Sequence, residues 1–380
     1  MKKFVELIRN VRKEQYTYVV EGLIAHKNPV AFLSLEPING AIQTVSQIRA
    51  RGINVSTLIT TDKTPPPNVQ RDFNITPLNE IFNLLPRPEY ILVLENIYDN
   101  AASRIALKYA PDCKVINLNE TDTEGFYAVF FEYLTELYDF YESLIDEKSK
   151  ETFCGYWLGR TSNQLGRFVY ADNEQYLTAG FIPKAGGIVI EAGAYDGGTA
   201  AIFADFGYKV YTFEMDTKSF EKAKKLAEIK NFVVENMGLG SYNHEMRYKM
   251  NGGEGNHWDD KGNEIAKVIS IDSYVRDKKF PCVDFIKLDV EGAELDVLEG
   301  AKATIAIHKP ILAISVYHKW NDFWILMNFV KSIRPDYEFA LRHYPVSSES
   351  LFNDSKYNRF FSLGLQPDSR TYGDCVLLAR

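Results

Sequence analysis

The second half of the chain alternates short apolar segments with helical ones, and this alternation restricts the fold more than any other feature. Apolar residues occupy successive positions in "GIVIEAG" (187–193), "KVYTFEM" (209–215), "VDFIKLD" (283–289) and "KPILAISVYH" (309–318). Strands of this kind are buried on both faces, as in a parallel sheet that helices cover. We therefore predict an α/β fold over residues 181–380, doubly wound around a mostly parallel sheet.

Other segments of this region complete the predicted pattern. The spacing of apolar residues predicts four helices, and two apolar segments near the end of the chain predict closing antiparallel strands. The helices are expected over 198–207, 217–230, 293–307 and 321–335, and the strands over 337–344 and 374–380.

The first part of the chain shows a shorter version of the same alternation. In residues 28–118, "NPVAFLSL" and "INVSTLIT" flank one helical segment, and "EYILVLEN" and "CKVINL" flank another. This predicts a smaller Rossmann-like α/β domain over residues 1–118. Its first turn, "SLEPINGA", has only Gly40, whereas a phosphate-binding turn needs several glycines. A structural or partner-docking role is favoured over nucleotide binding.

Residues 119–180 lie between the two α/β regions. Within 121–160, aromatic and aliphatic residues recur at helical spacing. We interpret 119–180 as an amphipathic helical connector.

Composition excludes several classes of protein. A net charge of −8 disfavours a protein that binds nucleic acid through phosphate contacts. No apolar run reaches the length of a membrane span, and the start of the chain lacks the features of a signal peptide. The four cysteines are far apart, which favours reduced thiols. We expect a cytoplasmic protein with no nucleic-acid partner, and a homo-oligomer stays open.

A glycine turn with an acidic residue follows the strand "GIVIEAG". In Glu191-x-Gly193-x-x-x-Gly197, the two glycines let the backbone approach a ligand closely. Glu191 would repel a pyrophosphate but would attract a cationic ligand, such as the amino group and sulfonium of S-adenosylmethionine. At the end of the next strand, Glu214 can accept hydrogen bonds from both ribose hydroxyls of a nucleoside. Glu214 alone would suit NAD equally well.

Longer motifs point to one family. "VIEAGAYDGGTAAIF", "VYTFEMD", "ISIDSYV", "VDFIKLDVEGAELDVLEGA" and "KPILAISVYHK", in this order, resemble the FkbM family of S-adenosylmethionine-dependent methyltransferases over roughly residues 181–320. The resemblance implies a class I methyltransferase fold with a seven-stranded sheet, and methyl transfer to a hydroxyl oxygen, often on sugars or polyketides. At Glu191 the family commonly has Asp.

The predicted cofactor is S-adenosyl-L-methionine. The residues expected to bind it are Glu191, Gly193, Ala194, Tyr195, Gly197, Glu214, Met215 and Asp289.

Asp289 and His318 are the candidate catalytic residues. A hydroxyl is a poor nucleophile until it loses its proton, so a general base is expected within hydrogen-bond reach. Asp289 and His318 end neighbouring strands, and a histidine has a suitable pKa. Alternatively, His318 could form a hydrogen bond with a nearby backbone group and have no catalytic role, and Asp289 could serve only to anchor the donor. Glu291 is interpreted as a helix cap, as is Asp272. No tight ligand cluster is visible, so no metal is predicted.

The polar segment 238–265 is open to two interpretations. It contains His257 and Trp258, and it could be a loop that offers an aromatic face to a sugar or an ordinary surface loop.

Two other functions compete with methyl transfer. An NAD-dependent oxidoreductase could use the pair Tyr274-x-x-x-Lys278. However, this pair precedes the predicted strand "VDFIKLD" instead of following it on a long helix, and the motif Gly-x-Gly-x-x-Gly is absent. A non-catalytic binding or scaffold protein is the second alternative. We predict an O-methyltransferase that acts on a carbohydrate or sugar-bearing metabolite.

Overall fold

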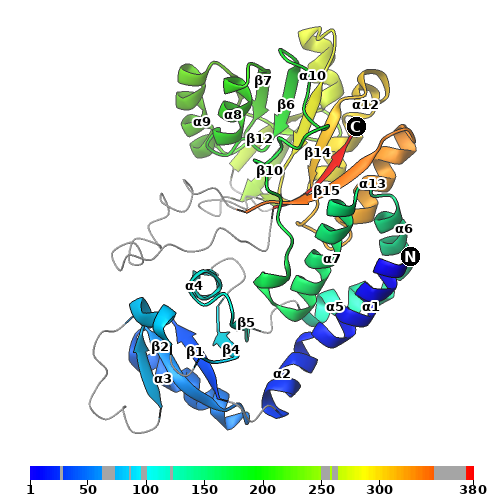
Figure 1. Ribbon diagram of the computed structural model, residues 1–380. Helices are drawn as coiled ribbons and strands as arrows, with labels where there is room; N and C mark the ends of the chain where they lie inside the picture. The colour runs from blue at the N-terminus through cyan, green and yellow to red at the C-terminus, as the bar shows by residue number, and fades with distance from the viewer. Residues whose placement is uncertain are drawn as a thin grey trace. The chain divides into compact units, whose positions relative to one another are not determined.

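The computed structural model describes residues 1–25, 29–61, 73–84, 87–95, 101–119, 123–249, 257–258, 264–345 and 374–380 (Figure 1). These residues form two compact units. Unit 1 takes those within Met1–Leu134, Glu151–Ala171 and His343–Gly373, and unit 2 takes those within Thr135–Lys150, Asp172–Arg342 and Asp374–Arg380. In these segments no helix has the length and apolar character needed to cross a membrane. All four cysteines carry free thiols.

Unit 1 is built on a five-stranded parallel sheet with the strand order β3-β2-β1-β4-β5. The strands are β1 (Val30–Ser34), β2 (Val55–Thr60), β3 (Asn74–Pro77), β4 (Tyr90–Val93) and β5 (Lys114–Asn117). The helices that lie wholly within this unit are α1 (Lys2–Glu14), α2 (Tyr16–Ala25), α3 (Ile38–Ala50), η1 (Leu78–Asn83), α4 (Ala101–Tyr109), α5 (Thr123–Glu132) and η2 (Leu165–Arg167). The strands predicted from "NPVAFLSL", "INVSTLIT", "EYILVLEN" and "CKVINL" are present. The sequence did not predict α1, α2 or β3.

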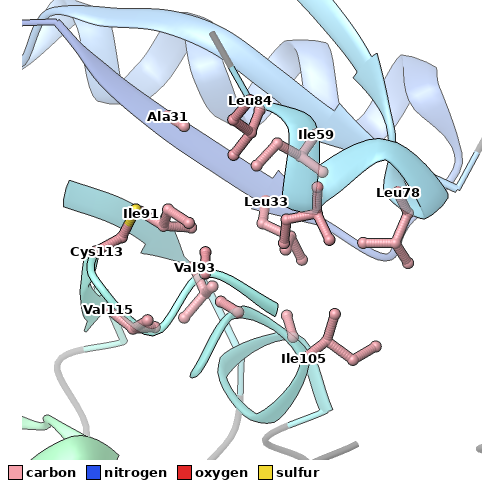
Figure 2. Packing of buried hydrophobic residues seen from close by; sticks show 14 of the residues in the cluster. Ala31, Leu33, Ile59, Leu78, Leu84, Ile91, Val93, Ile105, Cys113 and Val115 are labelled. Carbon is pink, nitrogen blue, oxygen red and sulfur yellow. The ribbon is translucent and has the colours of Figure 1, made fainter. Parts of the chain in front are cut away.

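Both faces of the unit 1 sheet are buried, because alternate residues of β1, β4 and β5 enter different clusters. Ala31 and Leu33 of β1 pack with Ile105 of α4 on one face, and Figure 2 shows this cluster. Phe32 of β1 packs with Val45 of α3 on the other face. Burial on both faces explains why these strands are apolar at successive positions.

Unit 2 is built on a seven-stranded sheet with the order β15-β16-β14-β13-β6-β7-β8. Strands β14, β13, β6, β7 and β8 pair in parallel, and β16 is antiparallel to β14. These findings confirm the predicted α/β fold with a mostly parallel sheet. The strands are β6 (Ile188–Ala192), β7 (Lys209–Phe213), β8 (Val233–Glu235), β13 (Phe285–Leu288), β14 (Ile311–Ser315), β15 (Phe339–His343) and β16 (Cys375–Ala379).

Two groups of helices accompany this sheet (Figure 1). Helices α8 (Gly198–Asp205) and α9 (Thr217–Lys230) pack against each other. The second group contains α10 (Ile271–Lys278), α11 (Glu294–Glu299), α12 (Lys302–His308) and α13 (Asp322–Ile333). Two further helices, α6 (Leu134–Glu142) and α7 (Glu147–Ser162), have residues in both units.

The single helix predicted over 293–307 is wrong, because the structure divides it into α11 and α12. The division lies at Gly300, where a Cβ atom would lie 2.0 Å from the Gly240 carbonyl oxygen. Asp272 caps the second of these helices. Its carboxylate accepts hydrogen bonds from the N–H groups of Ala303 and Thr304 at 2.9 and 2.8 Å.

The segment 238–265 contributes to a small second sheet, which neither loop interpretation anticipated. Its strand order is β11-β10-β12-β9. The strands are β9 (Gly238–Leu239), β10 (His244–Lys249), β11 (His257–Trp258) and β12 (Glu264–Ile269). The side chains of His257 and Trp258 lie outside the described part of the structure.

Candidate active site

The register of two central strands of unit 2 places a buried lysine beside Glu191. Strands β6 and β13 pair so that Lys287 is opposite Glu191. The Lys287 Nζ lies 3.4 Å from Glu191 Oε1, and these side chains are 4% and 0% exposed. The same ammonium donates a hydrogen bond to the Gly193 carbonyl oxygen at 2.9 Å. In the structure, the cation that Glu191 meets is therefore the ammonium of the neighbouring strand.

Asp289 follows β13 directly and is held by cationic and hydroxyl groups. Its Oδ2 lies 3.7 Å from Lys287 Nζ. The hydroxyls of Tyr317 and Tyr176 donate to its two oxygens at 3.2 and 3.4 Å. Burial alone would raise the pKa of Asp289, but the charges of Lys287 and His318 lower it below its usual value. Asp289 is therefore a stable carboxylate, and its side chain is 24% exposed.

Burial and opposite charges also act on the two neighbours of Asp289. Burial alone would lower the pKa of Lys287, but Glu191 and Asp289 raise it above its usual value, so the lysine stays charged. Burial raises the pKa of the Tyr317 hydroxyl, which therefore remains a hydrogen-bond donor.

His318, beyond the end of β14, has one ring nitrogen engaged and the other directed at carboxylates. Its Nδ1 lies 2.8 Å from Glu294 Oε1. Its Nε2 lies 3.6 Å from both Asp289 Oδ1 and Glu291 Oε2, and it has no hydrogen-bond partner among the described residues. The side chain is 9% exposed. Nε2 is therefore a buried atom beside two carboxylates, with no hydrogen bond to any described residue.

The pKa of His318 reflects two opposing effects. Burial alone would lower it, but the hydrogen bond to Glu294 and the nearby carboxylates raise it above its ordinary value.

Glu294, and not Glu291, organises the start of helix α11. Glu294 Oε1 accepts hydrogen bonds from the N–H groups of Val290 and Gly292 at 3.0 and 3.3 Å. Glu291 instead has a left-handed backbone with φ of 54°, and its side chain is 44% exposed. The interpretation of Glu291 as the helix cap is wrong. Glu291 lies in the turn before α11, whose N-cap residue is Ala293, and its carboxylate lies 3.6 Å from His318 Nε2.

Glu214 lies at the carboxyl end of β7, next to the glycine turn. Its Oε2 accepts a hydrogen bond from the Tyr195 N–H at 2.8 Å, and its Oε1 accepts one from the Asp216 N–H at 2.9 Å. Burial raises the pKa of Glu214 above its usual value. A carboxylate has about four acceptor positions. Two of them therefore remain for a ligand that brings hydroxyl donors.

Gly193 brings the glycine turn against the end of β13. Its φ is +83°, and a Cβ atom at this position would lie 1.9 Å from the Asp289 carbonyl oxygen. A side chain at Gly193 would therefore separate the turn from Asp289.

The structure brings the sequence-predicted residues together at one edge of the unit 2 sheet. Glu191, Gly193 and Asp289 meet around Lys287, and His318 joins them through Asp289. Glu214 is connected to the glycine turn through the Tyr195 N–H. The other predicted donor-binding residues lie in the turns after β6 and β7, namely Ala194, Gly197 and Met215.

Sequence reasoning missed Lys287, Glu294 and Tyr176 as parts of this edge. Lys287 had a usable signal, because a lysine in a short apolar strand is buried and needs a charged partner. Glu294 had no comparable signal in the sequence. Tyr176 comes from the segment before β6, and nothing in the sequence indicated its contact with Asp289.

The Tyr274 and Lys278 pair serves a structural role. The Tyr274 hydroxyl donates to Glu235 Oε1 at 2.8 Å, and Lys278 Nζ lies 3.2 Å from the same oxygen. Burial raises the pKa of Tyr274, which opposes its use as a catalytic acid. Among the described residues, no group of three or more histidine, cysteine or acidic side chains is arranged so that it could hold a metal ion.

Comparisons with known proteins give a family-model match and a similar fold. Residues 191–342 match the family model described as the methyltransferase FkbM domain. The crystal structure of the methyltransferase FkbM from Methylobacillus flagellatus is 18% identical, with a TM-score of 0.61, and the alignment covers 100% of this chain and 99% of that one. This likeness shows the fold. No curated protein matches the chain.

Two more distant structures cover about half of the chain. An rRNA methylase from Streptococcus thermophilus is 15% identical with a TM-score of 0.31, and covers 55% of this chain and 97% of its own. The Streptococcus mutans protein SMU.1697c, solved in complex with SAH, is 13% identical with a TM-score of 0.30, and covers 55% and 98%. The FkbM methyltransferase family model covers less than half of the chain, and the matched residues 191–342 include Glu191, Asp289 and His318.

Proposed function

We propose that the chain transfers a methyl group from S-adenosyl-L-methionine to a hydroxyl of a carbohydrate or sugar-bearing metabolite. The observation that carries this proposal is the group of charged side chains at one edge of the unit 2 sheet. There, Asp289 and His318 lie 3.6 Å apart, and His318 Nε2 has no hydrogen-bond partner among the described residues. The proposal places the donor and a general base at the ends of adjacent strands.

The donor would lie over the glycine turn, with its ribose at Glu214. Glu214 has acceptor capacity for two hydroxyls, and Gly193 keeps the turn close to Asp289. Met215 follows Glu214 in the sequence, and the Tyr195 N–H donates to the Glu214 carboxylate at 2.8 Å. When bound, S-adenosyl-L-methionine supplies an electrophilic methyl group. Glu191 contributes indirectly, because it holds the Lys287 ammonium against Gly193 and Asp289.

His318 is the better of the two candidates for the general base. Its Nδ1 faces a carboxylate at 2.8 Å, so the neutral ring carries its proton there and presents the Nε2 lone pair. The acceptor hydroxyl would give its proton to Nε2. The charges of Asp289 and Glu291 would then stabilise the imidazolium. Asp289 itself has a lowered pKa and is a weaker base, so it would orient the hydroxyl.

A hydroxyl acceptor suits this base. A sugar hydroxyl needs a base to become a nucleophile, whereas the neutral form of an amine does not, and His318 supplies that base. The choice of a sugar over another alcohol follows from the FkbM family resemblance.

The test is methyl transfer from labelled S-adenosylmethionine to a panel of acceptors, read by mass spectrometry. The panel contains free sugars, nucleotide-linked sugars, lipid-linked sugars, amines and thiols. We expect a mass gain of one methyl group on a sugar hydroxyl, and a loss of about 10²–10⁴-fold in kcat for His318→Gln. Transfer to an amine or thiol alone, or unchanged turnover in His318→Gln, would contradict the proposal.

A further inference from the structure

We propose that Glu294 is a positioning residue that fixes the His318 ring with its proton on Nδ1 and its Nε2 towards the acceptor. This inference rests on the proposed function, because it names the residue that prepares the base. Glu294 is the first residue of α11, and only 1% of it is exposed. Its contact with His318 at 2.8 Å is the shortest of the three carboxylate contacts to that ring.

One oxygen of Glu294 joins the base to the turn after β13. Oε1 accepts from Val290 N–H and Gly292 N–H and faces His318 Nδ1. Oε2 is buried without a hydrogen-bond partner in the described part of the chain. Oε1 contacts both the backbone of the turn and the His318 ring. The orientation of the ring therefore depends on the conformation of the turn that carries Asp289 and Glu291.

Charged groups from several elements face His318, and Glu294 acts among them. Asp289 from the end of β13 and Glu291 from the following turn approach Nε2. Asp322 at the start of α13 adds a further acidic group, and burial raises its pKa to about 7. The ammonium of the adjacent Lys319 donates to the Gly292 carbonyl oxygen. Among the described residues, Glu294 makes the shortest carboxylate contact to the ring, at Nδ1, and it therefore favours the tautomer with the proton on Nδ1.

The substitution Glu294→Gln separates charge from shape. The amide oxygen of Gln can occupy the Oε1 position and accept the same three hydrogen bonds, and the amide nitrogen takes the position of Oε2. The variant therefore keeps the turn but removes the negative charge beside His318. Glu299→Gln is the matched control, because Glu299 lies exposed on the same helix.

The experiment is nitrogen-15 NMR of the histidine rings across a pH titration of the full chain. His318→Gln identifies the His318 signals among the six histidines. We expect the neutral His318 ring of the natural sequence to carry its proton on Nδ1. In Glu294→Gln the midpoint of its titration should move to lower pH, whereas Glu299→Gln should leave it unchanged.

Kinetics supply the second measurement. In Glu294→Gln, kcat should fall about tenfold or more, as part of the roughly 10²–10⁴-fold due to a general base, and the acid limb of the pH profile should move to lower pH. KM for S-adenosylmethionine should change little.

The result that overturns the inference is a neutral His318 with its proton on Nε2, or an unchanged midpoint in Glu294→Gln. If the NMR results are as expected but no methyl transfer occurs, the positioning role stands and the proposed function falls.

Discussion

The two units contain parallel sheets of the same kind, but the carboxyl ends of their strands differ in how polar groups are satisfied. In unit 1, Asn117 Oδ1 accepts from the N–H groups of Glu95 and Asn119, and its Nδ2 donates to the Glu95 carbonyl oxygen. The Glu95 carboxylate accepts from Ala102 N–H and Ser103 N–H at the start of α4. These polar groups satisfy one another's hydrogen-bonding capacity.

In unit 2, the corresponding edge keeps buried polar atoms without hydrogen-bond partners among the described residues. They include His318 Nε2, Glu294 Oε2 and Asp216 Oδ1. A buried polar atom without a partner costs free energy, and native structures keep such atoms mainly where a function needs them. The comparison shows that two units with the same kind of sheet differ at their strand ends, so the fold alone does not identify a site.

The largest expected effect comes from removing the buried cation of unit 2. Lys287→Met leaves Glu191 and Asp289 without their ammonium, and it should cost about 3–5 kcal/mol of unfolding free energy. Native-state hydrogen exchange at β6 and β13 measures this loss, and exchange at β1 and β4 should not change.

The control for this prediction is an exposed ion pair. Lys230 Nζ lies 2.7 Å from Asp205 Oδ2, with side chains 38% and 57% exposed, so Lys230→Met should cost less than about 1 kcal/mol. The double variant Glu191→Gln, Lys287→Met should recover part of the loss. Equal losses of unfolding free energy in Lys287→Met and Lys230→Met would show that the buried ion pair contributes no more to stability than the exposed one.

The next effect is a pH dependence that only unit 2 should show. Asp322 is 4% exposed, and burial raises its pKa to about 7, above the roughly 3.9 of an unfolded chain. The folded state therefore holds a proton that the unfolded state loses, and the stability due to Asp322 falls as pH rises from about 4 to 7.

Asp322→Asn should remove this contribution, which amounts to roughly 2–4 kcal/mol across that range. Hydrogen exchange at β13 and β14, measured at pH 4.5 and 7, compares the variant with the natural sequence. The same pH slope in both chains would exclude Asp322 as its source.

The smallest effect belongs to unit 1. Glu95→Ala removes the cap of α4 and should cost about 1 kcal/mol, measured by hydrogen exchange at α4. Its affinity for S-adenosylhomocysteine should equal that of the natural chain. A weaker affinity would give unit 1 a part in donor binding and would break the comparison.

The sequence predicted most of the strands because burial on both faces leaves a continuous apolar run, as in β1, β6 and β13. It did not predict the small sheet of β9 to β12, whose strand β12 exposes alternate residues and lies in a polar, glycine-rich segment. It also missed the break at Gly300, which depends on the distant Gly240 carbonyl oxygen.

Within the site, the sequence indicated the acidic residues but not their partners. The strand ends pointed to Glu191, Glu214, Asp289 and His318, because carboxyl ends of parallel strands meet at one edge. The register that sets Lys287 against Glu191 is a tertiary property. The same is true of the turn in which Glu294, and not Glu291, accepts hydrogen bonds from backbone N–H groups.

Isothermal titration calorimetry with S-adenosylhomocysteine tests most directly whether the edge of the unit 2 sheet holds the donor. We predict saturable binding to the natural chain, about 100-fold weaker binding to Glu214→Ala, and no binding of NAD. Well-folded protein that gives no heat with S-adenosylhomocysteine, or that binds it equally well in Glu214→Ala, would contradict the account.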